Sequence, residues 1–239
     1  MASFLEDISS FLGTGDRNED GDTLAEFLEK YDQSKYESPS VTADIMVFKK
    51  PDDFKSVEEG LLLLMVQRRN HPSIGYWALP GGFLEMREDL EEAAKRELQE
   101  ETGLTDIPVQ LVNTFGEVWR DPRNRIVTAS YIALVNNDVK NPEAGDDAAQ
   151  AEWFDVKFNL KDESVITVNE KQVQQKLYEI KLHGPDNVKC SAIVKEEMNL
   201  KGIIKERKLS VVESSNIAFD HARFIVDGLI FLEKAMKNC

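Results

Sequence analysis

Cysteine, histidine and long apolar runs are scarce in this chain of 239 residues, which contains two cysteines and three histidines. Cys190 and Cys239 do not form a CxxC motif, and this excludes a disulfide framework and a zinc site. The longest apolar run, Leu61–Val66, is far shorter than the roughly 20 residues of a membrane-spanning helix. The N-terminus lacks the basic and apolar segments of a signal peptide. We therefore expect a soluble cytoplasmic protein.

Basic residues are also scarce, because the chain has 29 Lys and Arg against 44 Asp and Glu, a formal net charge of −15. This deficit argues against a nucleic-acid partner, whose phosphates are neutralised by Lys and Arg, and against an anionic membrane. The acidic excess is concentrated in two segments. Residues 1–40 carry three basic and ten acidic residues, a net charge of −7. Residues 85–101 carry three basic and eight acidic residues, a net charge of −5.

Apolar periodicity predicts an α/β domain over residues 41–239, preceded by an acidic N-terminal arm, residues 1–40. Strands are predicted at residues 41–49, 60–68, 109–119, 125–135 and 151–156. Helices are predicted at about 88–102, where Gly103 supplies a C-terminal stop, and at about 217–237. Residues 161–215 are charge-mixed and contain hairpin signals around residues 184–187, which predicts a small inserted antiparallel β segment before the last helix.

The predicted helix at about 88–102 carries acidic residues on the side that should be buried. At 100° per residue, Glu101 falls inside the apolar stripe that contains Leu90 and Leu98. A solvated face is the usual interpretation of an acidic helix, but it does not suit Glu101 or its neighbours Glu97 and Glu100. Adjacent like charges repel one another, and buried carboxylates without partners are costly. Mg²⁺ would resolve this conflict, because it prefers oxygen ligands and completes its shell with water and phosphate.

The spacing of these residues resembles the Nudix box, G-x5-E-x7-R-E-U-x-E-E-x-G-U, in which U is apolar. The matching residues are Gly82, Glu88, Arg96, Glu97, Leu98, Glu100, Glu101, Gly103 and Leu104. The resemblance implies the Nudix α/β/α sandwich with a mixed sheet, in which the box forms a loop, a helix and a loop. It also implies hydrolysis of a nucleoside diphosphate linked to another moiety, with Mg²⁺ as cofactor and Mn²⁺ as a substitute.

The resemblance also implies a role for each residue of the box. The metal ligands would be the carboxylates and one backbone carbonyl: Glu97, Glu100, Glu101 and Gly82. Glu88 and Arg96 would support them, and Gly81, which has no side chain, would leave room for the substrate. Two alternatives for the catalytic base stay open. One is Glu97, and the other is Asp146 or Asp147, in the loop before the last strand of the sandwich.

Segments outside the box are similar to the ADP-ribose pyrophosphatase branch of MutT-like proteins. These segments are Gly75–Phe83, Phe115–Tyr131, Ala144–Ala149 and Ala218–His221. ADP-ribose is therefore the expected substrate. Arg123 and Arg125 are candidates for binding its phosphates, because a guanidinium can make two parallel hydrogen bonds, although a solvated or subunit-interface role is an equal alternative. Phe115 and Trp119 could stack on adenine, but packing in the core is favoured.

Two other functions are compatible with these residues. The chain could hydrolyse another nucleotide, such as a nucleoside triphosphate, a sugar nucleotide or a dinucleotide. It could instead be a non-enzymatic, ADP-ribose-sensing Nudix-type transcriptional regulator. Such regulators carry a winged-helix domain after the last helix, for which the 18 residues after His221 leave no room, and the complete box also favours an enzyme. Relatives in this branch are often homodimers, so a second copy of the chain is the expected partner.

Overall fold

The computed structural model describes residues 4–58, 60–145, 148–169, 171–201 and 203–238, which fall into two compact units, Met1–Ser38 and Pro39–Cys239. The first unit contains the short 3₁₀ helices η1 (Ser9–Phe11) and η2 (Gln33–Lys35) and the α-helix α1 (Leu24–Lys30). A capping box starts α1, because Thr23 Oγ1 accepts from the Glu26 N–H while Glu26 Oε2 accepts from the Thr23 N–H.

The second unit is built on one mixed sheet of ten strands, in the order β10-β9-β8-β7-β2-β1-β6-β5, with β3 paired to β2 and β4 paired to β1. The strands are β1 (Ser40–Lys49), β2 (Leu62–Arg68), β3 (Trp77–Ala78), β4 (Gly81–Phe83), β5 (Gln110–Phe115), β6 (Ile126–Val135), β7 (Ala148–Val168), β8 (Lys171–His183), β9 (Lys189–Asn199) and β10 (Arg207–Ser215). β1 and β6 pair in parallel, and the remaining strand pairs are antiparallel.

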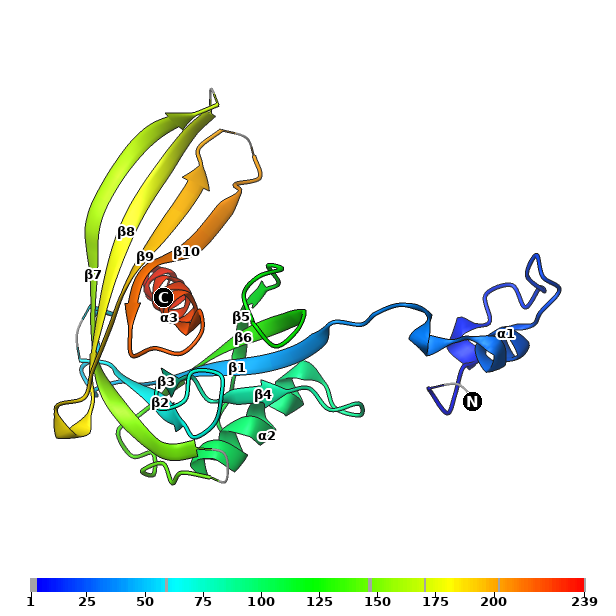
Figure 1. Ribbon diagram of the computed structural model, residues 1–239, viewed down its shortest axis with the longest axis horizontal. Helices are drawn as coiled ribbons and strands as arrows, with labels where there is room; N and C mark the ends of the chain where they lie inside the picture. The colour runs from blue at the N-terminus through cyan, green and yellow to red at the C-terminus, as the bar shows by residue number, and fades with distance from the viewer. Residues whose placement is uncertain (1–3, 59, 146–147, 170, 202, 239) are drawn as a thin grey trace. The chain divides into compact units, whose positions relative to one another are not determined.

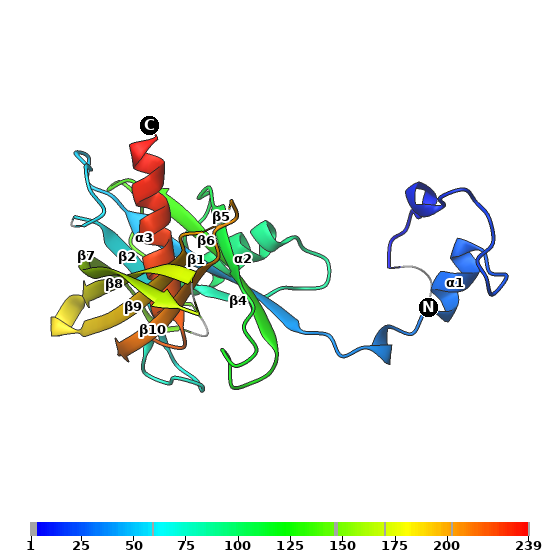
Figure 2. The same ribbon diagram turned by 90° about the horizontal axis from the view of Figure 1, so that it is seen from above.

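Two helices cover the two faces of this sheet, α2 (Leu90–Thr102) and α3 (His221–Lys237). Successive side chains of a strand point to opposite faces, so β1 contributes to both layers. Ile45 and its neighbours on one face pack against α2, whereas Met46 and Phe48 pack against α3. Figures 1 and 2 show the two helices on either side of β1. The predicted α/β/α arrangement with a mixed sheet is therefore confirmed.

The predicted β segment at residues 161–215 is antiparallel, but it is not a separate sheet. β7 runs without a break through residues 148–168, so β8, β9 and β10 extend the same sheet and curve around α3 (Figure 1). The predicted turn at residues 184–187 joins β8 to β9. The end of β7 was predicted too early because its second half is exposed and charge-mixed. A bulge between Leu160 and Asp162 also interrupts its alternation.

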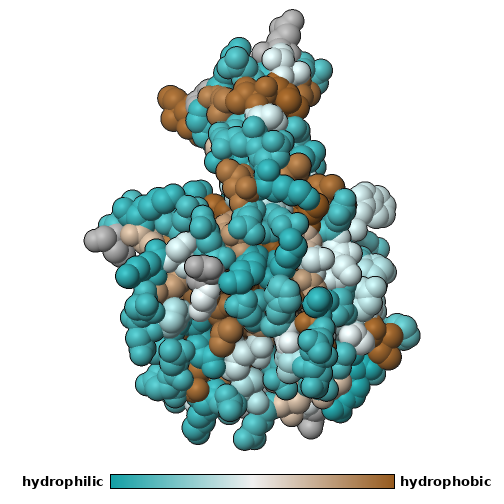
Figure 3. Space-filling model, turned by 90° about the vertical axis from the view of Figure 1, so that its left-hand side faces the viewer, coloured by the Kyte–Doolittle hydropathy of each residue, from teal (hydrophilic) through white to brown (hydrophobic). Residues whose placement is uncertain are grey.

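The strand predicted at residues 109–119 is also shorter in the structure, since β5 ends at Phe115. A loop, residues 116–125, then leads to β6. Hydrophilic residues predominate on the face of the molecule shown in Figure 3. Among the described residues, no helix combines the length and the apolar composition that would let it cross a membrane.

Candidate active site

The helix α2 is fixed at both ends by local interactions. Glu92 Oε2 accepts a hydrogen bond of 2.8 Å from the backbone N–H of Asp89, the residue before the first turn. At the other end, Gly103 adopts a left-handed conformation with φ of 70°, and its N–H donates to the Gln99 carbonyl. The acidic residues of the predicted box are therefore held on a helix with defined ends.

A cavity of about 440 Å³ lies beside this helix. Its lining residues come from β1, the ends of β2 and β4, α2, the loop 116–125 and the segment before α3. Those used below are Asp44, Arg68, Gly81, Gly82, Phe83, Arg96, Glu97, Glu101, Arg120, Arg123, Phe219 and His221. The fold thus brings residues far apart in the sequence to one cavity.

The carboxyl groups of Glu97 and Glu101 line this cavity, where Glu97 pairs with Arg96 and Glu101 accepts from a backbone N–H. Burial is the main reason that the pKa of Glu101 is raised to about 8, and the neighbouring carboxyl groups of Glu97 and Asp44 add to it. The Gly81 N–H donates to Glu101 Oε2 at 2.9 Å and partly offsets this effect. Burial also raises the pKa of Glu97, against the opposing influence of Arg96. Such carboxyl groups would be stabilised by a cation.

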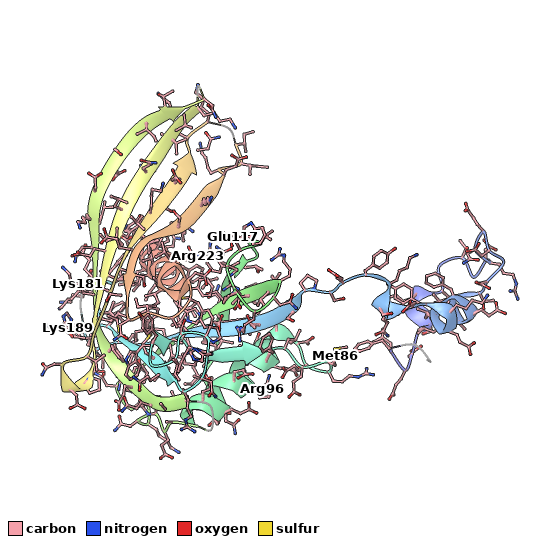
Figure 4. All side chains as sticks on the ribbon, in the orientation of Figure 1. Met86, Arg96, Glu117, Lys181, Lys189 and Arg223 are labelled. Carbon is pink, nitrogen blue, oxygen red and sulfur yellow. The ribbon has the colours of Figure 1, made fainter. Side chains whose placement is uncertain are left out.

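Arg96 connects the other acidic residues of the box. Its guanidinium donates to both carboxylate oxygens of Glu88, at 3.0 and 2.8 Å, to Glu97 Oε1 at 2.7 Å and to Glu100 Oε2 at 2.9 Å. It also donates to the Phe83 carbonyl at 3.0 Å, and thereby ties α2 to β4. Arg96 is labelled in Figure 4. The hydrogen bonds to Arg96 are the main reason that the pKa of Glu88 is lowered. Glu100 lies at the exposed edge of this group.

The residues present fit a divalent cation by their chemistry. Carboxylate oxygens are the ligands that Mg²⁺ prefers, and the Glu97 carboxylate packs directly against the backbone of Gly82, where a Cβ would lie 2.4 Å from Glu97 Oε1. Within the described residues, however, no three Asp, Glu, His or Cys side chains are already arranged as a metal site. Arg96 engages Glu97 and Glu100, and the Gly81 N–H engages Glu101. Each of these contacts uses one oxygen of its carboxylate, so a bound cation would take the other oxygen.

Asp44 belongs to this acidic group and was not identified from the sequence. It lies on β1 directly opposite Gly81 of β4 and is buried. Burial raises the pKa of Asp44 to about 7, while the nearby guanidinium of Arg120 opposes the shift. The available signal was an acidic residue in the middle of a strand whose next four residues are apolar. Its significance depends on the pairing of β1 with β4, which brings it to the cavity.

The candidate substrate-binding residues are divided by the fold. Arg123 lines the cavity, and its Nε and Nη2 donate to the two carboxylate oxygens of Asp121 at 3.0 and 2.9 Å. Arg125 instead donates to the Gly116 carbonyl at 2.6 Å and is not among the cavity-lining residues. Phe115 is buried in the core, where its ring stacks on Phe224 with centres 4.1 Å apart. Of the four candidate substrate-binding residues, the structure therefore brings Arg123 and Gly81 to the cavity, but not Arg125 or Phe115.

Trp119 does not pack in the core, as the sequence had favoured, but is 93 % exposed. The reason is that β5 ends before it, so Trp119 belongs to the loop 116–125 and not to a buried strand. Asp146 and Asp147, the alternative candidates for the catalytic base, lie outside the described residues.

An ion-pair network behind the cavity fixes the loop 116–125 against α3. Arg120 donates to the Asp220 carboxylate through Nε and Nη2, at 3.1 and 2.9 Å. Arg223 binds both Asp220 and Glu117, and Figure 4 labels the pair of Glu117 and Arg223. The Arg223 guanidinium holds the pKa of Glu117 at about 2. His221 Nδ1 accepts from the Leu79 N–H at 2.9 Å. These contacts give Asp220 and His221 structural roles.

Comparisons with known proteins agree with this arrangement. The family model of the NUDIX domain matches residues 43–170. The ADPR responsive transcriptional repressor NtrR of Acinetobacter baylyi is 42% identical over 113 residues, which are 46% of this chain and 42% of the repressor. The ADP-ribose pyrophosphatase of Methanocaldococcus jannaschii is 40% identical over 101 residues, 42% of this chain and 58% of that protein. The chain thus spans about half the length of the curated relatives it matches.

A solved structure resembles more of the chain. The crystal structure of a MutT/nudix family protein from Enterococcus faecalis superposes with a TM-score of 0.59 and 28% sequence identity. The match covers 86% of this chain and 68% of that protein. The NUDIX family model covers only residues 43–170 of this chain, a smaller share than 86%. The structural similarity therefore extends beyond the region that the family model matches.

Proposed function

Because this chain belongs to the Nudix family, we propose that it is a Mg²⁺-dependent hydrolase that cleaves the pyrophosphate bond of a nucleoside diphosphate derivative. The proposed substrate is ADP-ribose, which would yield AMP and ribose 5-phosphate. The observation that supports hydrolysis best is the buried carboxyl group of Glu101 beside Glu97, above a backbone that lacks side chains at Gly81 and Gly82. The similarity to an ADP-ribose pyrophosphatase supports the choice of substrate.

Glu97, Glu100 and Glu101, with the backbone carbonyl of Gly82, would hold the cation, for which Mn²⁺ is a suitable substitute. When bound, such a cation neutralises pyrophosphate charge and lowers the pKa of a water molecule. The protein's own contribution is orientation. Arg96 fixes Glu97 and Glu100 through hydrogen bonds of 2.7 and 2.9 Å, so both carboxylates are positioned before substrate arrives.

Phosphate binding and proton transfer involve other groups. Arg123 can bind a substrate phosphate from the cavity wall through Nη1, since its Nε and Nη2 donate to Asp121 and hold the guanidinium in place. Arg125 and Phe115 are not proposed as substrate-binding residues, because they lie away from the cavity. Glu97 and the pair Asp146 and Asp147 remain the candidates for the base that accepts the proton of the attacking water.

A substrate panel tests the proposal. Purified protein with Mg²⁺ or Mn²⁺ is incubated with ADP-ribose, a nucleoside triphosphate, a sugar nucleotide and a dinucleotide, and the products are separated and quantified. We expect AMP and ribose 5-phosphate from ADP-ribose at the highest kcat/KM. Preferential turnover of another member would reassign the substrate, and failure to hydrolyse any of them would remove the enzymatic function.

The 42% identity to a repressor that responds to ADP-ribose supports a second candidate function, an ADP-ribose-dependent regulator. The formal charge of −15 disfavours contact with DNA phosphates, so we propose that the protein has no nucleic-acid partner. A gel shift with genomic DNA fragments at physiological salt should show no retained complex. We also propose a homodimer, for which light scattering after size exclusion should give twice the chain mass of 27.1 kDa.

A further inference from the structure

One wall of the cavity is an alternating stack of arginine and phenylalanine side chains. Arg68 Cζ lies 4.9 Å from the centre of the Phe219 ring. Arg123 Cζ lies 5.3 Å from the same ring centre and 5.2 Å from that of Phe83. All four side chains line the cavity. We call Arg68, Phe219, Arg123 and Phe83 the wall stack. Distances of this size permit cation–π attraction between each guanidinium and the adjacent ring.

The wall stack is assembled by tertiary structure. Phe83 ends β4, Arg68 ends β2, Arg123 belongs to the loop 116–125, and Phe219 lies just before α3. Only Phe83 is near the predicted box, directly after Gly82. Four separate segments therefore converge on one wall, next to the carboxylates that would hold the cation.

Contacts outside the wall stack hold its members in place. Arg68 Nε donates to the Pro72 carbonyl at 2.7 Å. Arg123 is held by its paired hydrogen bonds to Asp121. The backbone carbonyl of Phe83 accepts from Arg96. A ligand would therefore meet a surface that is already ordered, which reduces the entropy cost of binding.

Phe83 is the member of the wall stack that leaves most aromatic surface uncovered. It is 45 % exposed although it lines a cavity, whereas Arg68 and Phe219 are partly buried. An exposed phenyl ring beside a phosphate-binding site is a suitable platform for a planar base, because bases of every kind have an aromatic face that can stack. The guanidinium of Arg123 lies over the same ring and orients it.

From this geometry we propose that Phe83 is the platform on which the nucleobase of the substrate stacks, supported by Arg123, whose guanidinium also lies over Phe219. The inference rests on the proposed function, since it assumes a nucleotide in the cavity. The platform offers no hydrogen-bonding group of its own. It binds any planar base and favours a purine, which has the larger ring surface for stacking. It does not distinguish bases by hydrogen bonds to their polar groups.

Isothermal titration calorimetry with AMP and with ribose 5-phosphate tests the platform without depending on turnover. The two ligands each carry a ribose and a phosphate, but only AMP has a base. Alanine substitution at a stacking position weakens nucleotide binding, so in Phe83→Ala we expect the Kd of AMP to rise about fivefold or more. The Kd of ribose 5-phosphate should change less than about twofold. Phe83→Tyr should restore AMP binding.

Trp119→Ala is the matched control, because Trp119 is a more exposed aromatic residue of the loop 116–125 that does not line the cavity. We expect its AMP affinity to equal that of the unaltered protein. Stacking at Trp119, shown by weaker AMP binding in this variant alone, would overturn the proposal. Equal losses for AMP and ribose 5-phosphate in Phe83→Ala would also overturn it, as would unchanged AMP binding there or no AMP binding by the unaltered protein.

The substrate panel separates this result from the proposed function. Turnover of ADP-ribose with AMP affinity unaffected in Phe83→Ala would refute the platform alone. Base-dependent AMP binding without any turnover would refute the hydrolase and leave the platform in place.

Discussion

Replacing Glu101 by glutamine should make the metal-free protein more stable while removing its response to Mg²⁺. The substitution preserves the size of the side chain and an oxygen that can accept from the Gly81 N–H. It removes a carboxyl group whose negative form is disfavoured by burial and by the neighbouring carboxyl groups of Glu97 and Asp44. Such a residue would be retained for function at a cost in stability.

The size of the effect follows from the two pKa values of Glu101. The unfolded chain ionises near 4.5, whereas the folded protein keeps the proton until about pH 8. As the pH rises from 4.5 to 8, the unfolded state releases a proton that the folded state retains, so the free energy of unfolding falls. The difference amounts to about 1 kcal/mol at pH 5 and about 3 kcal/mol at pH 7. The free energy of unfolding of Glu101→Gln should not fall in this way, because the glutamine side chain does not ionise.

Urea unfolding in the presence of a chelator, at pH 5 and pH 7, measures the difference. We expect the free energy of unfolding of Glu101→Gln, relative to that of the unaltered protein, to be about 2 kcal/mol larger at pH 7 than at pH 5. Glu91→Gln is the control, since Glu91 lies on the exposed face of the same helix and pairs with Lys95. It should change stability by less than about 0.5 kcal/mol at either pH.

Addition of Mg²⁺ completes the test. A cation that binds the folded state raises the stability of the unaltered protein, whereas Glu101→Gln should gain little. If the difference in free energy of unfolding between Glu101→Gln and the unaltered protein is the same at pH 5 and pH 7, then Glu101 is not a desolvated carboxyl group. An equal gain from Mg²⁺ in both proteins would show that Glu101 is not a ligand.

Three further substitutions probe the site and its support. Gly82→Ala should lower kcat/KM at least about tenfold with an unchanged circular dichroism spectrum, because its methyl group would lie 2.4 Å from Glu97 Oε1. His221 is buried with its pKa lowered to about 4, so its contribution to stability is complete above pH 6.5 and is lost as the pH falls through 4. Between pH 6.5 and pH 4, the free energy of unfolding measured with urea should fall about 3 kcal/mol less in His221→Gln than in the unaltered protein. The pKa of Glu117 is about 2 beside Arg223, so Glu117→Gln should remove stability that is present above pH 4.5 and lost toward pH 2, measured by acid titration.

The helix at the site could be predicted because its sequence contains a physical conflict. Glu101 falls on the buried side of a helix, and the structure places it beside the cavity with its pKa raised by burial. The spacing of the box carries this information within a short stretch of chain. The α/β/α layers were implied by the resemblance to the Nudix box, and the alternation in β1 agrees with them, since one face packs on α2 and the other on α3.

Features that depend on distant parts of the chain could not be predicted in this way. Asp44 reaches the cavity because β1 pairs with β4, and Phe219 meets Arg68 only after α3 has packed on the sheet. Trp119 falls inside the strand predicted at residues 109–119, although β5 ends at Phe115. The local periodicity of the sequence does not show which distant segments pair. These pairings decide which aromatic residues line the cavity.

The long strand β7 also limits how the protein can be shortened. Its first half pairs with β2 and its second half with β8, so one strand joins the part of the sheet around β1 and β2 to the part made by β8, β9 and β10. The helix α3 is buried on nearly every side, partly by apolar residues of β8 and β9. A truncation that removed residues 161–215 would expose these surfaces of α3 to water. Attempts to reduce this chain to a minimal domain should therefore yield insoluble protein, whereas insertions at the tip between β7 and β8 should be tolerated.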